Sequence, residues 1–476
     1  MRDNEKSFGP DYHTLSRSLN ARWRELCERY LPLTARDSIW RYSRGVSPND
    51  PDQGWKLRIP ASALTASAVM EKVAPFLQRR KLLFKAPVSL QELEKLNSGI
   101  YYGYSQVGKV ITVYPQTTAE AVRLARVLHR LTRHMRHAPA VPFDLKFRPE
   151  GCLYYRYGSF SVLEKENADG TRTLAIRDPE GQLVADRRDS DKGMPDWVTD
   201  PFATKRAQRR TKIVETPLLK TFRAFRALSQ RGKGGVYHAL DLSVAPPRLC
   251  VLKEGRENGE TGLDGLDGYR RIEHEERVLA ALQSEGVTSP PRVYSSFKAE
   301  KNYYLALEYI EGETLERWLG KRKRRLAVSS ALRCALRISN LVARIHAAGW
   351  VWRDCKPGNL MLTNGGEIRP LDFEGACPVE TPDPMPWGTI SYVPPEWKDQ
   401  FRGQSRLPED LYALGVLIYL LLTGQLPDAS SMLPVERLRR DVPAGARRVV
   451  MELLDADSRR RPTARAVARR LKAALS

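Results

Sequence analysis

The stretch GWVWRDCKPGNLMLTNGGEIRPLDFEG, residues 349–375, constrains this chain more than any other segment. It holds a carboxylate at Asp354, an ammonium at Lys356, an amide at Asn359 and a second carboxylate at Asp372. The part between the last two predicts a hairpin that turns at a Gly-Gly pair and brings Asp372 back beside Asn359. Each acid alone would be more typical of a turn or a helix cap, so the argument depends on their joint spacing.

These residue types in this order suit phosphoryl transfer, which needs positioning and charge neutralisation more than covalent help from the protein. Asp354 is predicted to orient an acceptor hydroxyl and accept its proton, and Lys356 to place a positive charge beside the transferred phosphate. Asn359 and Asp372 offer oxygen ligands of the kind that Mg²⁺ prefers. The spacing therefore predicts a catalytic pair beside a metal site.

Upstream segments predict a nucleotide site. The turn SQRGKGGVYHALD places Gly232, Gly234 and Gly235 between strand-like runs, where backbone N–H groups can approach phosphates closely. Lys253 lies in the aliphatic run LCVLKEG and is a predicted catalytic and nucleotide-binding residue. Glu275, in the helical run IEHEERVLAAL, can pair with this lysine and hold it against the phosphates.

The segment YYLALEYIEGETL predicts a strand that enters a linker, where backbone groups near Glu308 and Ile310 would contact a purine edge. In this order the pieces resemble the eukaryotic-type protein kinases. WRDCKPGN stands where HRDxKxxN is usual, LDFEG where DFG is usual, and GTISYVPPE, DLYALG and RRRPTA match later motifs. The resemblance implies a bilobal fold, with the N-lobe over 216–310 and the C-lobe over 311–476, that uses ATP or GTP and Mg²⁺.

Three departures from the kinase pattern bear on activity. Trp352 replaces the histidine of HRD, a structural position where we expect tolerance, and Glu374 replaces the glycine of DFG, where it would stiffen the segment and leave Asp372 intact. The glycine-rich turn lacks the first glycines of GxGxxG, so lower nucleotide affinity is expected. Lys356 and Thr389 match the serine/threonine-specific pattern, and an active serine/threonine kinase is predicted.

Two arginines of this half have predicted carboxylate partners. The segment ACPVETPDPMPWG has one hydroxyl candidate, Thr381, beside Glu380 and Asp383. We expect a resident carboxylate to neutralise Arg353, without obligatory phosphorylation of this segment. Arg461 of RRRPTA is predicted to pair with Glu396.

The N-terminal part, residues 1–188, predicts a mixed domain of helices and strands, followed by a polar linker over 189–215. The whole chain is therefore placed in the α+β class. A lysine inside an aliphatic strand is most simply explained by an edge or half-exposed position. Several such cations beside a kinase instead suggest a site for a phosphorylated group. They occur in QGWKLRIPAS, LLFKAP, VGKVITVYP and LYYRYGSF, at Lys56, Arg58, Lys85, Lys109 and Arg156.

These runs resemble the N-terminal lyase domain of the class III lanthipeptide synthetases. Those enzymes phosphorylate Ser and Thr of a ribosomal precursor peptide and then eliminate the phosphate to give dehydroamino acids. The resemblance implies that Lys85 is the base that removes the α-proton. It also implies that Lys56, Lys109 and Arg156 bind the phosphate and the carbonyl, with Asp144 as a helper.

Arg58 stands where the GWKxHxSA motif of that family has a histidine, the expected acid for the departing phosphate. An arginine keeps its proton at any working pH, so it stabilises charge but is no general acid. Two interpretations stay open: elimination with electrostatic support, or binding of a phosphopeptide without elimination. His129, His134 and His137 are a substitute source of the acid, although a basic surface helix explains them more simply.

The amino-acid composition narrows the choice of binding partners and of cellular setting. The formal net charge of +22 favours anionic partners, but no stacking or groove-reading motif supports nucleic acid. Six scattered cysteines without a clustered ligand set indicate a reduced, cytoplasmic setting. The longest apolar run, LYALGVLIYLLLTG, is short for a bilayer crossing and predicts a buried helix.

Two functional hypotheses follow. The first is a kinase that phosphorylates Ser or Thr of a precursor peptide or protein, with elimination by the N-terminal domain as a second step. The second is a signalling-type kinase whose N-terminal domain only docks substrate or partners. The synthetases also carry a C-terminal cyclase, whereas this sequence ends at Ser476, so a separate cyclase is expected for any ring formation. A homodimer is compatible with both, and the sequence specifies neither the peptide nor the choice between ATP and GTP.

Overall fold

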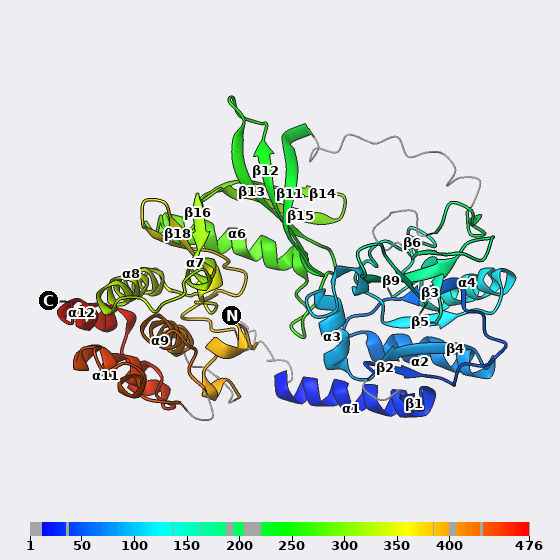
Figure 1. Cartoon of the computed structure of the whole chain (residues 1–476), viewed down its shortest axis with the longest axis horizontal. Helices are drawn as coiled ribbons and strands as arrows, with labels where there is room; N and C mark the ends of the chain where they lie inside the picture. The colour runs from blue at the N-terminus through cyan, green and yellow to red at the C-terminus, as the bar shows by residue number, and fades with distance from the viewer. Residues whose placement is uncertain are drawn as a thin grey trace, which may run out of the picture. The chain divides into compact units, whose positions relative to one another are not determined.

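The computed structural model divides the chain into two compact units. Unit 1 comprises Met1–Tyr237, Glu254–Arg270 and Lys298–Tyr303, and unit 2 comprises His238–Lys253, Arg271–Phe297 and Tyr304–Ser476. Helices are interspersed with several separate sheets, which confirms the α+β class (Figure 1). The structure describes residues 12–34, 38–135, 137–161, 163–186, 194–203, 220–383, 385–398, 406–428 and 432–475.

A seven-stranded sheet forms the centre of the N-terminal part, in the order β1-β2-β4-β5-β3-β7-β6. Strand β3 pairs antiparallel with both β5 and β7, so it lies inside the sheet. Side chains alternate between the two faces of a strand. The strands are β1 (Leu33–Thr34), β2 (Trp40–Tyr42), β3 (Gln53–Ile59), β4 (Leu83–Pro87), β5 (Ile111–Tyr114), β6 (Leu145–Lys146) and β7 (Tyr154–Ser159).

Four helices accompany this sheet, and α1 and α2 lie side by side (Figure 1). Their apolar faces and the apolar face of β3 form one core that includes Trp23, Leu57 and Leu77. Helix α4 begins at Thr117, whose side chain accepts a hydrogen bond from the N–H of Glu120 and so caps the first turn. The helices are α1 (Tyr12–Tyr30), α2 (Ala66–Arg79), α3 (Leu90–Ser98) and α4 (Thr118–Thr132).

Two further sheets follow along the chain. A three-stranded sheet has the order β10-β9-β8, from β8 (Glu164–Glu166), β9 (Arg172–Arg177) and β10 (Leu183–Ala185). A five-stranded sheet has the order β11-β12-β13-β15-β14. Its strands are β11 (Phe222–Gln230), β12 (Gly234–Asp241), β13 (Arg248–Gly255), β14 (Val293–Ala299) and β15 (Asn302–Glu308), with α6 (Gly268–Ser284) between β13 and β14.

The C-terminal part is mainly helical. Helix α9 is almost wholly buried and packs against α8 and α11, which confirms the predicted buried helix. Among the described residues, no helix combines the length and apolar character needed to cross a membrane. The helices are α7 (Leu315–Gly320), α8 (Val328–Ala347), α9 (Leu407–Thr423), α10 (Val435–Leu438), α11 (Ala444–Leu453) and α12 (Ala464–Ala473).

Short strands occur in and around the segment 349–375, emphasised in the sequence analysis. Strands β16 (Gly312–Thr314), β18 (Leu360–Thr363) and β19 (Ile368–Pro370) form one sheet, and β17 (Trp350–Val351) pairs with β20 (Cys377–Pro378). The predicted turn between β18 and β19 is present, with Gly366 at φ +76°, a conformation that favours glycine. The predicted linker at 189–215 falls mostly outside the described residues, which include only 194–203 of it.

Candidate functional site

Lys253 of β13 is the centre of a buried charge cluster in unit 2. Its Nζ donates to both carboxylate oxygens of Glu275 on α6, at 2.8 and 2.7 Å, and to Oδ1 of Asp372 at 3.2 Å. Glu275 also accepts the N–H of Phe373, which fixes the segment beside Asp372. The structure thus brings together three of the predicted nucleotide and metal residues.

Asp354 organises a second cluster in the same unit. Its Oδ2 accepts hydrogen bonds from Lys356 Nζ at 2.8 Å and from Asn359 Nδ2 at 2.7 Å. Its Oδ1 accepts the hydroxyl of Thr389 at 3.1 Å, and Lys356 also donates to that hydroxyl, at 2.7 Å. A carboxylate held in this way by a cation, an amide and a hydroxyl is fixed in orientation.

The hairpin β18–β19 returns Asp372 to Asn359, as the Gly-Gly turn predicted. The N–H of Leu371 donates to the carbonyl oxygen of Asn359 at 2.8 Å. Because Asn359 uses its Nδ2 toward Asp354, its amide oxygen is the atom suited to a cation. A neutral amide oxygen and the carboxylate of Asp372 form a donor set that fits a hard divalent ion.

The predicted cations of the N-terminal part meet on one face of the seven-stranded sheet. Lys85 of β4 and Arg58 of β3 both lie opposite Thr112 of β5, and Lys56 shares a face with Arg58 because side chains alternate along a strand. They surround a cavity of about 70 Å³, which we call the N-terminal cavity. It is lined by Trp40, Lys56, Arg58, Lys85, Gln106, Lys109, Thr112 and Tyr114.

Burial of these cations is unusual. Lys56, Arg58 and Lys109 are each less than a tenth exposed, and lysine and arginine are rarely buried without a compensating charge. Arg58 Nε lies 3.0 Å from the buried carboxylate of Asp144. Lys85 Nζ lies 4.1 Å from the centre of the Trp40 ring, a cation–π contact.

Arg156 differs from the other predicted phosphate ligands. It lies opposite Lys56 in the register of β3 and β7. The described lining of the N-terminal cavity does not include Arg156. Its guanidinium donates to the buried carboxylate of Asp186 at 2.9 Å. Direct binding of phosphate by Arg156 stays a prediction. The structure shows Arg156 in an ion pair with Asp186.

Sequence reasoning missed Trp40, Gln106 and Tyr114 as neighbours of the cations. Trp40 belongs to a strand of three residues, too short for a period-2 pattern to predict. Its only signal is an aromatic pair, Trp40 and Tyr42, flanking Arg41, and both rings lie within 6 Å of the Lys85 ammonium.

Comparison with known proteins identifies the family of the C-terminal part. Residues 249–470 match the protein kinase domain. Serine/threonine-protein kinase PknL of Mycobacterium tuberculosis is 31% identical over 226 residues, which cover 45% of this chain and 53% of that protein. PknA of the same organism is 31% identical over 218 residues, 44% of this chain and 48% of PknA.

This part of the chain is a serine/threonine protein kinase domain. Domains of this class use ATP and a divalent metal. The chain spans about half the length of the two mycobacterial kinases.

The N-terminal part has its own relatives. Residues 24–213 match the RamC N-terminal domain. A probable SapB synthase of Streptomyces coelicolor is 30% identical over 399 residues, 81% of this chain but 42% of that protein. The chain therefore combines a RamC N-terminal domain with a protein kinase domain, as the sequence motifs predicted.

Trp352 of the kinase domain takes over structural contacts at the position of the usual histidine. Its indole N–H donates to the carbonyl oxygen of Asp372 at 2.9 Å, and its ring stacks on Phe373 with centroids 5.6 Å apart. Its backbone N–H donates to the buried carboxylate of Asp410. The expected tolerance at this position has a structural explanation, since the substitution still orients the segment that carries Asp372.

Glu374 adds a third carboxylate to the cluster around Lys253. It is buried, and its Oε1 lies 3.7 Å from Lys253 Nζ. Oxygen atoms of Glu275, Asp372 and Glu374 all lie within 4.8 Å of one another. Burial raises the pKa of Glu275 above its ordinary value; Lys253 opposes this shift, and the neighbouring carboxylates of Asp372 and Glu374 add to it. Sequence reasoning assigned Glu374 only a stiffening role and missed this contact.

The expected partners of two arginines are present. Arg353 donates to Asp383 at 2.9 Å and to Glu409 at 3.1 Å, so resident carboxylates neutralise it. Arg461 donates to both carboxylate oxygens of Glu396, one of them at 2.7 Å. Arg353 has φ +69°, a strained backbone that these contacts and the bond from its N–H to Asp410 over-determine.

The predicted glycine-rich turn makes close contacts inside unit 1. The N–H of Gly232 donates to the carbonyl oxygen of Ser98 at 2.9 Å. A Cβ on Gly234 would lie 1.7 Å from the backbone carbonyl oxygen of Glu254, whereas a Cβ on Gly235 would meet only the side chain of Tyr237. Packing therefore requires glycine at position 234, and contact of these backbone amides with phosphate stays a prediction.

The segment predicted to contact a purine lies at the end of β15. Glu308 is the last residue of that strand, and its side chain accepts two hydrogen bonds from Arg369, both 2.8 Å long. These bonds hold the pKa of Glu308 below its usual range. Ile310 follows and is buried. Purine contact by these backbone groups stays a prediction.

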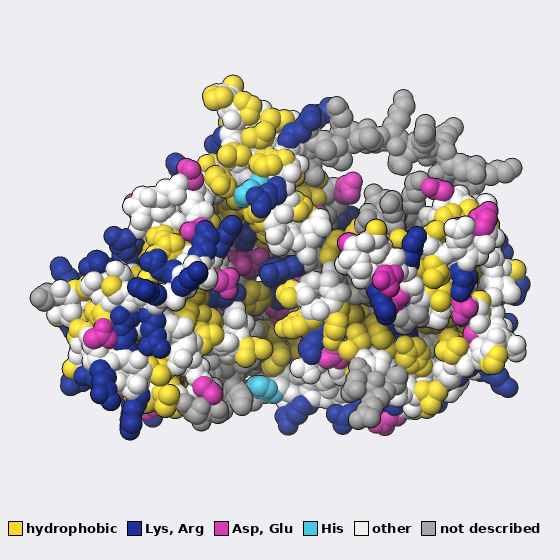
Figure 2. All heavy atoms as spheres, viewed as in Figure 1, with side chains coloured by type: hydrophobic (Ala, Val, Ile, Leu, Met, Phe, Trp, Pro, Cys, Tyr) yellow, Lys and Arg dark blue, Asp and Glu magenta, His cyan; other side chains and the backbone are white. Residues whose placement is uncertain are grey.

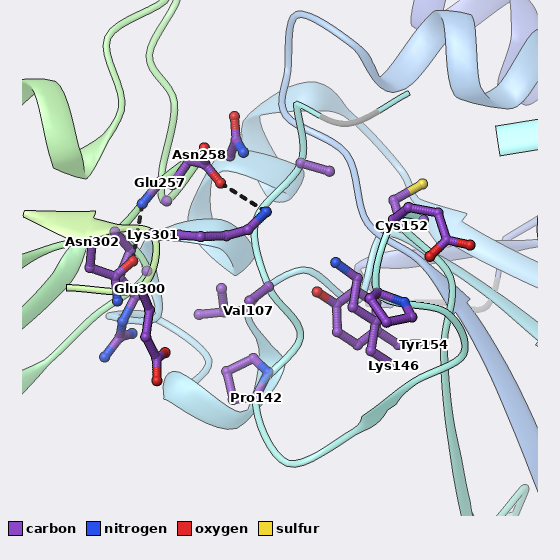
Figure 3. A pocket seen from close by; sticks show the side chains of 18 of the residues that line it. Val107, Pro142, Lys146, Cys152, Tyr154, Glu257, Asn258, Glu300, Lys301 and Asn302 are labelled. Carbon is purple, nitrogen blue, oxygen red and sulfur yellow. Dashed lines mark hydrogen bonds and ion pairs between the residues drawn. The ribbon is translucent and has the colours of Figure 1, made fainter. Parts of the chain in front are cut away.

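A larger cavity of about 360 Å³ lies within unit 1 (Figure 3). Lys146 and Tyr154 line it from one side, and Glu257, Lys301 and Asn302 from the other, as Figure 3 shows. Lys301 lies 3.4 Å from Glu257, so the acids and bases of this cavity largely compensate each other. Because basic and acidic side chains line it in equal number, the charge of this cavity does not indicate which class of ligand would bind.

Proposed function

We propose that this chain transfers the γ-phosphoryl group of ATP to a Ser or Thr hydroxyl of a peptide substrate, in a lanthipeptide-like biosynthesis. The observation that carries the proposal is the cluster of Asp354, Lys356 and Thr389, held at 2.7–3.1 Å beside Asn359. The relative named probable SapB synthase supports a peptide product rather than a signalling target.

In the transfer step, the acceptor hydroxyl donates its proton to Asp354 while its oxygen forms the new bond to phosphorus, and ADP leaves with the electrons of the broken P–O bond. Lys356 neutralises charge on the transferred group. Lys253, held by Glu275, orients the phosphates of the donor. A divalent ion, which we propose to be Mg²⁺ held by Asn359 and Asp372, supplies further charge neutralisation when bound.

In a second step, we assign the N-terminal cavity to the phosphorylated residue. Its four cations, Lys56, Arg58, Lys85 and Lys109, suit a dianionic phosphate and leave little room for a larger anion. Lys85, in its neutral form, takes the α-proton, the Cβ–O bond breaks, and phosphate leaves with the electron pair, which gives a dehydroamino acid.

A specific observation supports the alternative without elimination. Arg58 replaces the family's acid and forms an ion pair with Asp144, and the Lys85 ammonium lies over the ring of Trp40, a contact that favours its charged form. In that case the cavity only binds the phosphopeptide, and the kinase step stands alone.

The mass of the product distinguishes these outcomes. The chain is incubated with ATP, Mg²⁺ and a candidate Ser-containing peptide, and the peptide is weighed. Loss of one water per modified residue supports both steps. Gain of one phosphoryl group without water loss supports the kinase alone, and an unchanged peptide with every candidate substrate contradicts the proposal.

A further inference from the structure

A basic cavity in unit 2 is separate from the predicted catalytic residues. Its volume is about 880 Å³, and it lies between the loop before β14, helix α8 and the turn between β18 and β19. We call it the arginine cavity. It is lined by Gly286, Thr288, Ser289, Arg292, Glu308, Arg337, Asn340, Arg344, Gly365, Gly366, Glu367, Ile368 and Arg369.

Positive charge exceeds negative charge in this lining. Four arginines face two glutamates, which leaves a surplus of two positive charges. Glu308 is already occupied, because Arg369 donates two hydrogen bonds to it and Arg292 lies 3.7 Å from it. Figure 2 shows that Lys and Arg side chains gather over the part of unit 2 that holds α8 and α12.

Two arginines carry the surplus charge. Arg337 donates to the backbone carbonyl of Gly366 and, among the described residues, forms no ion pair. Arg344 is exposed, and its guanidinium has no partner among the described side chains. The hydroxyl of Ser289 is buried in this lining without a hydrogen-bond partner in the described part of the chain. The cavity therefore offers unused donors to an anion.

The spacing of the donors points to more than one anionic group. Arg337 and Arg344 are seven residues apart on α8, two turns on the same face, with Asn340 between them. Seven residues of helix advance about 10 Å. A peptide in the polyproline II conformation advances about 3.1 Å per residue with three residues per turn, so carboxylates three residues apart lie on one side of the peptide and are separated by a similar distance. A single phosphate would leave most of this cavity of about 880 Å³ unfilled.

We propose that the arginine cavity is a docking site for an acidic peptide segment, bound in the polyproline II conformation with carboxylates three residues apart. One carboxylate pairs with Arg337 and the next with Arg344, while Asn340 and Ser289 hydrogen-bond to the peptide backbone. The proposal concerns binding at a surface outside the catalytic cluster, so it is tested without turnover and stands or falls separately from the proposed function.

Fluorescence anisotropy of labelled peptides with the full chain tests the proposal. The probe is GSGEGSEGSG, with GSGQGSQGSG as the uncharged control and GSGEEGSGSG as the control for spacing. The variants are Arg344→Gln, which removes a charge that has no partner among the described side chains, and the double variant Arg337→Gln with Arg344→Gln. Arg333→Gln on the same helix is the matched control, because Arg333 is exposed but outside the lining.

We expect the chain to bind the spaced-glutamate probe about tenfold more tightly than the glutamine control. Arg344→Gln should weaken that binding about threefold to fivefold, and Arg333→Gln should leave it unchanged. The double variant should abolish the preference for glutamate. Equal binding of the glutamate and glutamine probes overturns the proposal, and so does an equal loss in Arg333→Gln. Full displacement of the probe by inorganic phosphate, or equal binding of the adjacent-glutamate peptide, overturns the assignment to an extended acidic peptide.

Discussion

At the scale of single residues, Glu374 changes the electrostatics of the nucleotide site most. A glycine at this position would add no charge, whereas this glutamate places a third carboxylate, itself buried, 3.7 Å from Lys253. A triphosphate must approach the same ammonium. The extra negative charge opposes that approach, since buried charges are weakly screened.

Glu374→Gln tests this effect while keeping the size of the side chain. Removal of the carboxylate should lower the KM for ATP about threefold to tenfold, because like-charge repulsion beside the phosphates is relieved. Initial rates of phosphoryl transfer at varied ATP give the value. An unchanged or higher KM would show that Glu374 does not face the nucleotide.

Arg353 has a different residue-scale consequence. Its guanidinium is buried and already paired with Asp383 and Glu409, so no phosphate is needed to neutralise it. Thr381→Ala should therefore keep full kinase activity, and Asp383→Asn should reduce it by about tenfold, because the buried guanidinium of Arg353 loses one of its charge partners. Loss of activity in Thr381→Ala, with recovery in Thr381→Glu, would refute this account.

At the scale of elements, the alternation of side chains along β3 places Lys56 and Arg58 on one face of the sheet. The order β4-β5-β3, which sets Lys85 and Arg58 opposite the same Thr112, comes from pairings between distant segments. No local pattern encodes that order. The partner of Arg156 was missed for the same reason, since Asp186 lies far along the chain and follows β10.

The loop after β2 is an element whose stability depends on pH. Arg44 donates two hydrogen bonds to Asp50, at 2.6 and 2.7 Å, and these bonds hold the pKa of Asp50 well below its usual range. This loop follows Trp40 and Tyr42, which contact Lys85. A carboxyl with a depressed folded-state pKa stabilises the fold above its unfolded pKa, and that stability is lost as the pH falls.

Asp50→Asn should lower the free energy of unfolding by about 1–2 kcal/mol at neutral pH. The difference from the unchanged chain should shrink as the pH falls below the ordinary carboxyl pKa. Urea unfolding at several pH values measures it. A difference that stays constant down to acidic pH would mean that the ion pair does not stabilise the loop.

At the scale of the whole molecule, the kinase motifs predicted most of the catalytic cluster, because each lies on an element whose spacing is local. The hairpin that joins Asn359 to Asp372 is such a case. The arginine cavity was not predicted, since its lining comes from three separated segments.

The two proposed steps, phosphoryl transfer and elimination, would pass through a phosphorylated intermediate that can be trapped. Lys85→Met removes the proposed base, so a phosphorylated peptide should accumulate where the unchanged chain yields the dehydrated product. Phosphoryl transfer itself should keep its rate. Mass spectrometry over time follows both species. Dehydration at an undiminished rate in Lys85→Met would exclude Lys85 as the base.

The most direct test of the central claim compares the unchanged chain with Asp354→Asn in a single assay of phosphoryl transfer from ATP to a Ser-containing peptide. The asparagine keeps the shape of the side chain but accepts no proton, so kcat should fall about 10²-fold to 10⁴-fold while the affinity for ATP stays the same. Phosphoryl transfer by Asp354→Asn at the rate of the unchanged chain would contradict the assignment of this site as the catalytic centre.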